Sequence, residues 1–245
     1  MKILIVFCFS LILLCSCLLI AHFGRKWNLK PLIAFGSGAL LSICFLDFLP
    51  QAFTNQTSYE VISLFILFGI LVQGLADIYL LPQLSFLDKW LKKENSNPVH
   101  SHSHTFNTGS VCSLAGCLSI CSFFDGIRLF SALNITESVA FITAFALFFH
   151  LLSEGVLVAS LVLSSGIKKK ALFVFVFCMA GALILGALFA QLFFISFSYS
   201  ALIAFASGML IYVCFVHLLP FSLKQRKKSW FFIGLLLFLS FHFLA

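Results

Sequence analysis

The chain has 245 residues, of which 62% are hydrophobic and only 9% are charged. Soluble domains carry about 25% charged residues, so this composition excludes an ordinary soluble domain. The formal net charge is +7. Basic loops beside anionic lipid produce the same excess, so the charge does not indicate a nucleic-acid partner.

Long apolar runs fill most of the chain and predict helices that cross a bilayer. A hydrocarbon core of about 30 Å needs about 20 apolar residues per helix. The runs are continuous, whereas barrel strands alternate in hydrophobicity. We therefore predict an all-α integral membrane protein with one transmembrane domain over residues 1–245. Its eight helices are expected near residues 3–23, 31–52, 60–84, 110–133, 137–164, 171–197, 199–220 and 229–245.

The basic residues predict which loops face the cytosol. Thirteen of the 15 Lys and Arg lie in alternate loops, in residues 25–30, 89–93, 168–170 and 224–228. Basic loops stay on the cytosolic side of a membrane. Both termini are therefore predicted on the non-cytosolic side of a plasma or organelle membrane.

The first span has a second interpretation, as a cleaved signal peptide, because it pairs a short basic start with an apolar core. Its apolar run continues to Phe23, which is long for such a peptide. We favour a membrane-spanning helix.

The second and seventh spans contain a repeat. Residues 32–50 and 202–220 match at 11 of 19 positions, at a constant offset of 170. Each copy ends in Leu-Pro and carries one ionisable residue three positions before the proline, Asp47 or His217. Each proline is expected to end its helix.

Five crossings separate the two copies, so they run in opposite directions and form an inverted repeat. The predicted arrangement is three helices, two central helices and three helices. In transporters built this way, the substrate lies near the membrane midplane, where the halves meet. The fourth and fifth spans are therefore expected to hold the site.

The third span and the loop after it carry further polar residues. Gln73 and Asp77 share a helix face, and we expect them to form interhelical hydrogen bonds. The cytosolic loop 85–109 contains His100, His102 and His104. Such tracts bind metals weakly, so the loop is predicted to collect or sense metal, or else to be a plain linker.

The two central spans carry the candidate site. An ionisable residue at the bilayer centre costs at least about 2.5 kcal/mol, so each one needs an explanation. Cys121 and Asp125 on the fourth span, and His150 and Glu154 on the fifth, are each spaced four apart and share a face. Thiolate, imidazole and carboxylate are ligands of Zn²⁺. The alternative is that each pair only holds helices together.

Arg128 lies three residues after Asp125, on roughly the same helix face. A positive charge there would repel a divalent cation. We consider two explanations. The side chain extends to the membrane surface, or it pairs with Asp125 or Glu154. In the second case it acts as a gate latch or marks a protein that no longer transports.

Four short motifs follow one another on the expected spans. Residues 121–126 read Cys-Ser-Phe-Phe-Asp-Gly, and residues 150–155 read His-Leu-Leu-Ser-Glu-Gly. Residues 47–50 read Asp-Phe-Leu-Pro, and residues 217–220 read His-Leu-Leu-Pro. The chain thereby resembles the ZIP (Zrt/Irt-like) metal-ion transporters. Their corresponding helices typically read His-Asn-x-x-Asp-Gly, His-Asn-x-Pro-Glu-Gly, His-Leu-Leu-Pro and Asp-Leu-Leu-Pro.

The resemblance implies transport of zinc or a similar divalent ion into the cytosol, without enzymatic activity or a resident cofactor. The implied metal ligands are Cys121, Asp125, His150 and Glu154. Asp47, His217 and Arg128 are candidate transport-pathway residues. Cys121 replaces the family's histidine, and residues that hold a second metal in some members are missing at Ser122 and Leu151. We therefore expect one metal site.

Two other functions stay open. A metal sensor or regulatory protein would keep the fold without transport. A membrane-embedded zinc hydrolase is a remote alternative, since the chain has no His-Glu-x-x-His motif. The predicted partners are a divalent metal ion and the lipid bilayer, without nucleic acid, and a homodimer is left open.

Overall fold

The structure is a computed structural model that describes residues 2–23, 29–53, 58–80, 108–192, 199–225 and 228–244. These residues contain α-helices, short π-helical turns (η) and no strand, which confirms the predicted all-α class. The elements are α1 (Lys2–Phe23), α2 (Lys30–Ile43), η1 (Cys44–Phe48), α3 (Leu49–Phe53), α4 (Tyr59–Leu75), η2 (Ala76–Leu80), α7 (Thr108–Ala132), α8 (Glu137–Ser164), α9 (Lys169–Leu192), α10 (Tyr199–Val213), η3 (Cys214–Leu218), α11 (Leu219–Lys224) and α12 (Ser229–Leu244).

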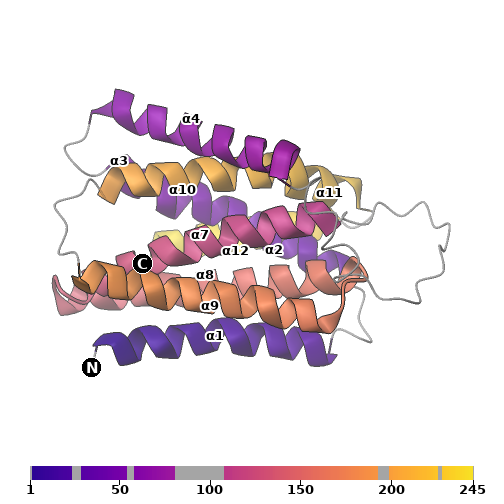
Figure 1. The fold of residues 1–245 in the computed structure, drawn as a ribbon, viewed down its shortest axis with the longest axis horizontal. Helices are drawn as coiled ribbons and strands as arrows, with labels where there is room; N and C mark the ends of the chain where they lie inside the picture. Colours follow the sequence, from indigo (N-terminus) through magenta and orange to yellow (C-terminus); the bar gives the residue numbers. More distant parts are fainter. Residues whose placement is uncertain are drawn as a thin grey trace.

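The helices lie side by side in one bundle, with both chain termini toward the same end (Figure 1). Seven helical stretches of the described chain are long and apolar enough to cross a membrane, and α12 is a shorter apolar helix. The protein is thus a multi-span, all-α membrane protein.

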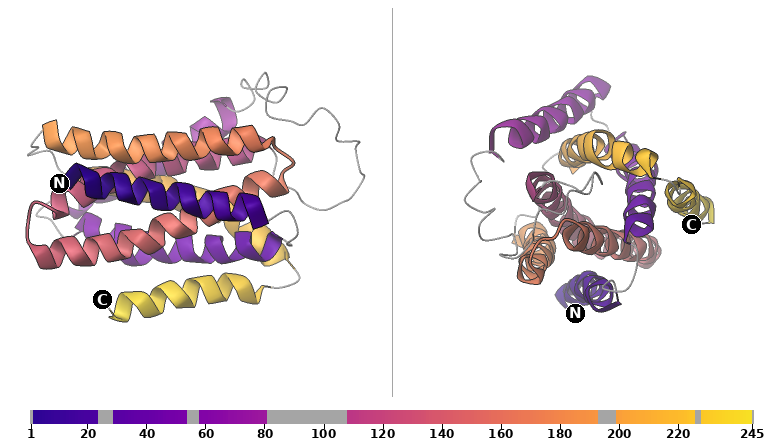
Figure 2. Two further views of the ribbon diagram at one scale, coloured as in Figure 1. Left: turned by 90° about the horizontal axis from the view of Figure 1, so that it is seen from below. Right: turned by 90° about the vertical axis from the view of Figure 1, so that its right-hand side faces the viewer.

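The central helices α7 and α8 are the most buried. In each, 67% of the apolar stretch is covered by other parts of the chain, against 17% in α4. Seen along the bundle, α4 and α12 lie at its edge (Figure 2). The fold therefore encloses the ionisable side chains of Asp125, His150 and Glu154, which lie on these two helices.

Three π-helical turns interrupt the expected spans. Two of them, η1 and η3, lie at repeat-equivalent positions, because Cys44 and Cys214 differ by the repeat offset of 170. Each turn precedes a proline, Pro50 or Pro220, which lacks an N–H and clashes with the carbonyl four residues earlier in an α-helix. The wider turn accommodates that clash. The amide before the proline reaches the carbonyl five residues back.

The expectation that these prolines end their helices is therefore wrong. The backbone stays helical to Phe53 in the first copy and to Lys224 in the second. Each proline instead stands near the start of a short α-helical segment, where its missing N–H costs little.

Glycines set the closest helix contacts, and these contacts repeat at equivalent positions. A Cβ added to Gly38 of α2 would collide with the carbonyl of Phe231 in α12. At the equivalent position of α10, a Cβ on Gly208 would collide with the carbonyl of Ile66 in α4. Small residues let membrane helices approach this closely.

The partner helices reciprocate. A Cβ on Gly234 of α12 would meet the carbonyl of Phe35, and one on Gly69 of α4 would meet the carbonyl of Phe205. Phe35 and Phe205 again differ by 170. The two copies of the repeat thus make the same contacts with the helices that cover them.

The outer helices α1 and α9 follow the same rule against the central pair. A Cβ on Gly126 of α7 would meet the carbonyl of Leu183 in α9. One on Gly155 of α8 would meet Ser16 and the carbonyl of Leu13 in α1. Leu13 and Leu183 differ by 170 as well. Each central glycine directly follows an acidic residue of the candidate site.

We predict that Gly208→Ala lowers the melting temperature of the detergent-solubilised protein by several degrees, because overpacking costs about 1–3 kcal/mol. The control is Gly181→Ala, since nothing lies within 4 Å of a Cβ added there. Melting followed by size-exclusion chromatography measures both variants. Equal melting temperatures would show that the contact between α4 and α10 is not tight.

Candidate metal centre

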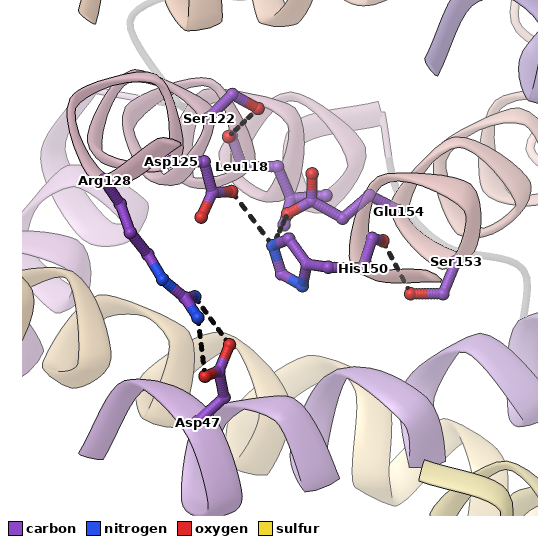
Figure 3. Close-up of polar contacts among 8 residues, drawn as sticks. All are labelled: Asp47, Leu118, Ser122, Asp125, Arg128, His150, Ser153 and Glu154. Atoms are coloured by element: carbon purple, nitrogen blue, oxygen red, sulfur yellow. Dashed lines mark hydrogen bonds and ion pairs between the residues drawn. The ribbon is translucent and has the colours of Figure 1, made fainter. Parts of the chain in front are cut away.

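Helices α7 and α8 bring three ionisable side chains together. Asp125 comes from α7, and His150 and Glu154 come from one face of α8 (Figure 3). One ligand atom from each lies within 4.8 Å of the other two. The imidazole Nε2 is 3.1 Å from Asp125 Oδ2 and 3.2 Å from Glu154 Oε1. A single nitrogen thus faces both carboxylates.

The cluster is enclosed by protein. Asp125 and Glu154 are 0% exposed and His150 is 2% exposed. Neither carboxylate nor either ring nitrogen makes a hydrogen bond of good geometry with any residue that the structure describes. Buried polar groups normally have such partners. One oxygen or nitrogen atom of each side chain therefore faces those of the other two, as the ligand atoms of a shared cation do.

The neighbouring hydroxyls do not join the cluster. Ser122 donates to the carbonyl of Leu118 at 2.9 Å, and Ser153 donates to the carbonyl of His150 at 2.8 Å (Figure 3). Both hydrogen bonds lie within the residue's own helix. The groups of the cluster that could bind a metal are accordingly two carboxylates and an imidazole, a combination that suits Zn²⁺ and other divalent transition metals.

Cys121 lies outside the group of three, although it is fully buried on the same helix. Its thiol lies beside that of Cys117 and within electrostatic reach of Glu154 and Asp125. The structure therefore brings together three of the four predicted ligands. The role of Cys121 stays a prediction.

Phe48 contacts the cluster, a contact that no pattern in the sequence predicts. Its ring packs against the imidazole of His150 with 5.5 Å between centroids. Phe48 is buried in η1, directly after Asp47. An apolar residue inside an apolar span carries no mark of what it touches, so only the fold identifies this contact.

Arg128 binds Asp47, which neither explanation from the sequence named. Its Nη1 donates to Oδ2 at 2.6 Å and its Nη2 to Oδ1 at 2.8 Å, a bidentate pair (Figure 3). Gln51 also donates to Oδ1 of Asp47, at 2.6 Å. The side chains of Arg128 and Asp47 are 11% and 24% exposed. One candidate pathway residue thus neutralises another.

His217, the repeat counterpart of Asp47, also has an acidic partner. Its Nε2 lies 2.9 Å from Oδ2 of Asp77 in η2, and Tyr212 donates to the same oxygen at 3.3 Å. Gln73 donates to the hydroxyl of Ser113 in α7 at 2.8 Å. The expected interhelical hydrogen bonds of Gln73 and Asp77 are therefore confirmed.

The three loop histidines, His100, His102 and His104, lie outside the described residues. Their predicted contact with metal stays a prediction.

Comparison with known families decides the class of protein. A family model described as ZIP zinc transporter matches residues 87–243, more than half of the chain. The chain belongs to the ZIP zinc transporter family. A search of curated proteins returns no match.

This ZIP protein is accordingly an integral, multi-pass membrane protein, and the family supports zinc or another divalent metal ion as its transported substrate. The match includes the buried cluster and the second copy of the repeat. The first copy lies outside it. The reciprocal glycine contacts connect that first copy to the part of the chain that the family model covers.

We predict opposite effects of Glu154→Gln with and without metal. Without metal, the melting temperature should rise, because the change removes one of two buried carboxylates that face a single imidazole, and Asp125 remains to pair with it. With Zn²⁺, wild-type protein should be stabilised by binding, and the variant should lose most of that shift. Melting curves with and without Zn²⁺ measure both effects.

The control is Ser153→Ala, which removes a buried hydroxyl bonded within its own helix. It should keep the Zn²⁺ shift. An unchanged shift in Glu154→Gln would contradict a role of this carboxylate in metal binding.

Proposed function

We propose that the protein carries Zn²⁺ or a similar divalent ion into the cytosol through a site near the membrane midplane. Asp125, His150 and Glu154 bind the ion. The observation that carries this proposal is their convergence on the two most buried helices, without other hydrogen-bond partners among the described residues. Membership of the ZIP family supplies the class of substrate.

The proposed orientation rests on the basic loops. Lys30 begins α2 at its cytosolic end, so Asp47 and Arg128 lie on the outer side of the cluster. Asp77 precedes the basic loop after α4, and His217 lies shortly before Lys224, so this pair lies on the cytosolic side. The common end of both termini in Figure 1 agrees with an even number of crossings.

The proposed architecture is three helices, two central helices and three helices, related by an inverted repeat. The contacts of Gly38 and Gly208 support it, as do those of Leu13 and Leu183. Helices α1 to α4 form one half, and α9 to α12 form the other. Movement of such halves against each other exposes a central site to each side in turn.

The proposed chemistry is ligand exchange. The ion loses water and gains an imidazole and two carboxylates, which compensates for its dehydration. Cys121 is the candidate fourth ligand, and a thiolate favours Zn²⁺ or Cd²⁺ over Mg²⁺ and Ca²⁺. Protons compete with metal for all of these groups. Acidification of the compartment that loads the site should therefore slow uptake.

The direct test is metal accumulation in cells that express wild type or His150→Ala/Glu154→Ala. The double variant keeps one of the three ligands, so uptake should fall to the background of untransfected cells. Ser153→Ala serves as the control and should transport at the wild-type rate, with equal surface expression. Equal uptake by wild type and the double variant would refute the proposed site.

The ion pair of Arg128 with Asp47 favours a second candidate, a ZIP-fold metal sensor without transport. A permanent cation beside the pathway would repel a divalent ion. Reconstituted protein would then bind Zn²⁺ and move none into liposomes, and Arg128→Ala would restore the flux. Measurable flux in wild type excludes this candidate.

A further inference from the structure

One π-helical turn, η1, connects the buried cluster to a second polar group. Its residue Phe48 packs on the imidazole of His150, and the preceding Asp47 binds Arg128. Helix α7 makes the same connection from the other side, because Asp125 and Arg128 lie three residues apart on it. In Figure 3 the side chain of Arg128 extends from α7 across to Asp47.

A cavity of about 280 Å³ reaches this ion pair. Asp47, Gln51 and Arg128 form much of its polar lining, and Thr143 and Phe149 line it from α8. The three cluster residues are not part of its wall. The ion pair therefore forms part of the cavity wall, and through Phe48 and α7 it is connected to the enclosed cluster.

The pair hinders a metal cation in the cavity in two ways. The guanidinium of Arg128 is always charged and cannot coordinate a metal. Its bidentate contact also uses both oxygens of Asp47, one of which already accepts from Gln51. A divalent ion in the cavity thus meets a positive group, and the carboxylate in the cavity wall is not available to it.

The equivalent position of the other repeat copy supports a role in access. His217 lies on η3 and pairs with Asp77 on η2, so both repeat-equivalent residues form ion pairs on π-helical turns. Such turns occur often at functional sites. The chemistry differs, because imidazole and carboxylate are both metal ligands, whereas the Asp47 pair contains one group that is not.

We propose that the Asp47–Arg128 pair is the outer gate of the transport pathway, which rests on the function proposed above. The ion passes when the guanidinium leaves Asp47, and the freed carboxylate receives the ion before it reaches Asp125, His150 and Glu154. Release of η1 also loosens Phe48 from the imidazole. Opening of the gate and access to the cluster are thereby one movement.

A purely structural ion pair makes a different prediction. If the pair only holds α7 against η1, removing either partner lowers the melting temperature and slows uptake to a similar degree. If the pair is a gate, the two removals act in opposite directions. Removing the guanidinium of Arg128 opens the approach to the metal ion. Removing the carboxylate of Asp47 leaves an unpaired guanidinium there.

The test measures Zn²⁺ influx into proteoliposomes at subsaturating Zn²⁺, with a fluorescent chelator inside. We expect Arg128→Met to raise the initial rate several-fold and Asp47→Asn to lower it several-fold. Arg128→Met/Asp47→Asn should recover at least the wild-type rate. Asn134→Ala is the matched control, since it removes a hydrogen bond to Lys2 at the same end of the bundle. Its rate should not change.

Slower influx in both single variants, with similar losses of melting temperature, would overturn the gate. If Arg128→Met does not fold, Arg128→Gln replaces it with a side chain that keeps hydrogen bonding without charge. The same increase in rate is expected, and an unchanged or lower rate overturns the proposal.

A second readout separates the gate from transport itself. The rate of Zn²⁺ binding to the detergent-solubilised protein does not depend on transport. Stopped-flow mixing with a competing chelator measures this rate. If wild type binds Zn²⁺ but carries none, the proposed function fails. The gate then still stands if Arg128→Met binds Zn²⁺ several-fold faster than wild type, and it falls if the rates are equal.

Discussion

The structure depends on the electrostatic balance of three ionisable groups enclosed where a membrane protein can least accommodate them. Two carboxylates of Asp125 and Glu154 face one imidazole nitrogen of His150. A protonated imidazole compensates one of the two negative charges, and a neutral imidazole compensates none. A divalent cation with a neutral imidazole brings the group to zero net charge. In a medium of low dielectric constant this neutrality decides which species the cluster can hold.

The helix packing serves this enclosure. Gly126 and Gly155 directly follow the two acidic residues, and each lets an outer helix lie against the back of a central helix. The same spacing that turns a carboxylate toward the cluster thus turns a glycine toward α9 or α1. Larger side chains there would move the central helices, and the two carboxylates would no longer face the same imidazole nitrogen. Packing and ligand geometry are therefore one constraint on α7 and α8.

The spacing of residues predicted which side chains share a face of one helix, but it did not predict the contacts between different helices. The spacing of four placed His150 and Glu154 on one face, and the acidic residue of α7 joined them. The same spacing also suggested Cys121, whose thiol lies beside that of Cys117 and outside the group of three. The partner of Arg128 lies 81 residues away in sequence, and the contact of Phe48 with His150 leaves no polar mark. The prolines marked the repeat correctly, yet each helix continues past its proline through a π-helical turn instead of ending there.

The inverted repeat preserves backbone geometry and lets the chemistry of its two copies diverge. The π-helical turns and the glycine contacts recur at equivalent positions, so both copies can make similar movements. The ionisable residues do not recur, because Asp47 pairs with a guanidinium and His217 pairs with a carboxylate. A guanidinium cannot coordinate a metal, whereas an imidazole and a carboxylate both can. The pair on η1 therefore presents a fixed positive charge to a divalent cation, and the pair on η3 presents two groups that can bind it. A shared backbone geometry thus carries two different chemistries, which a repeat with identical side chains could not provide.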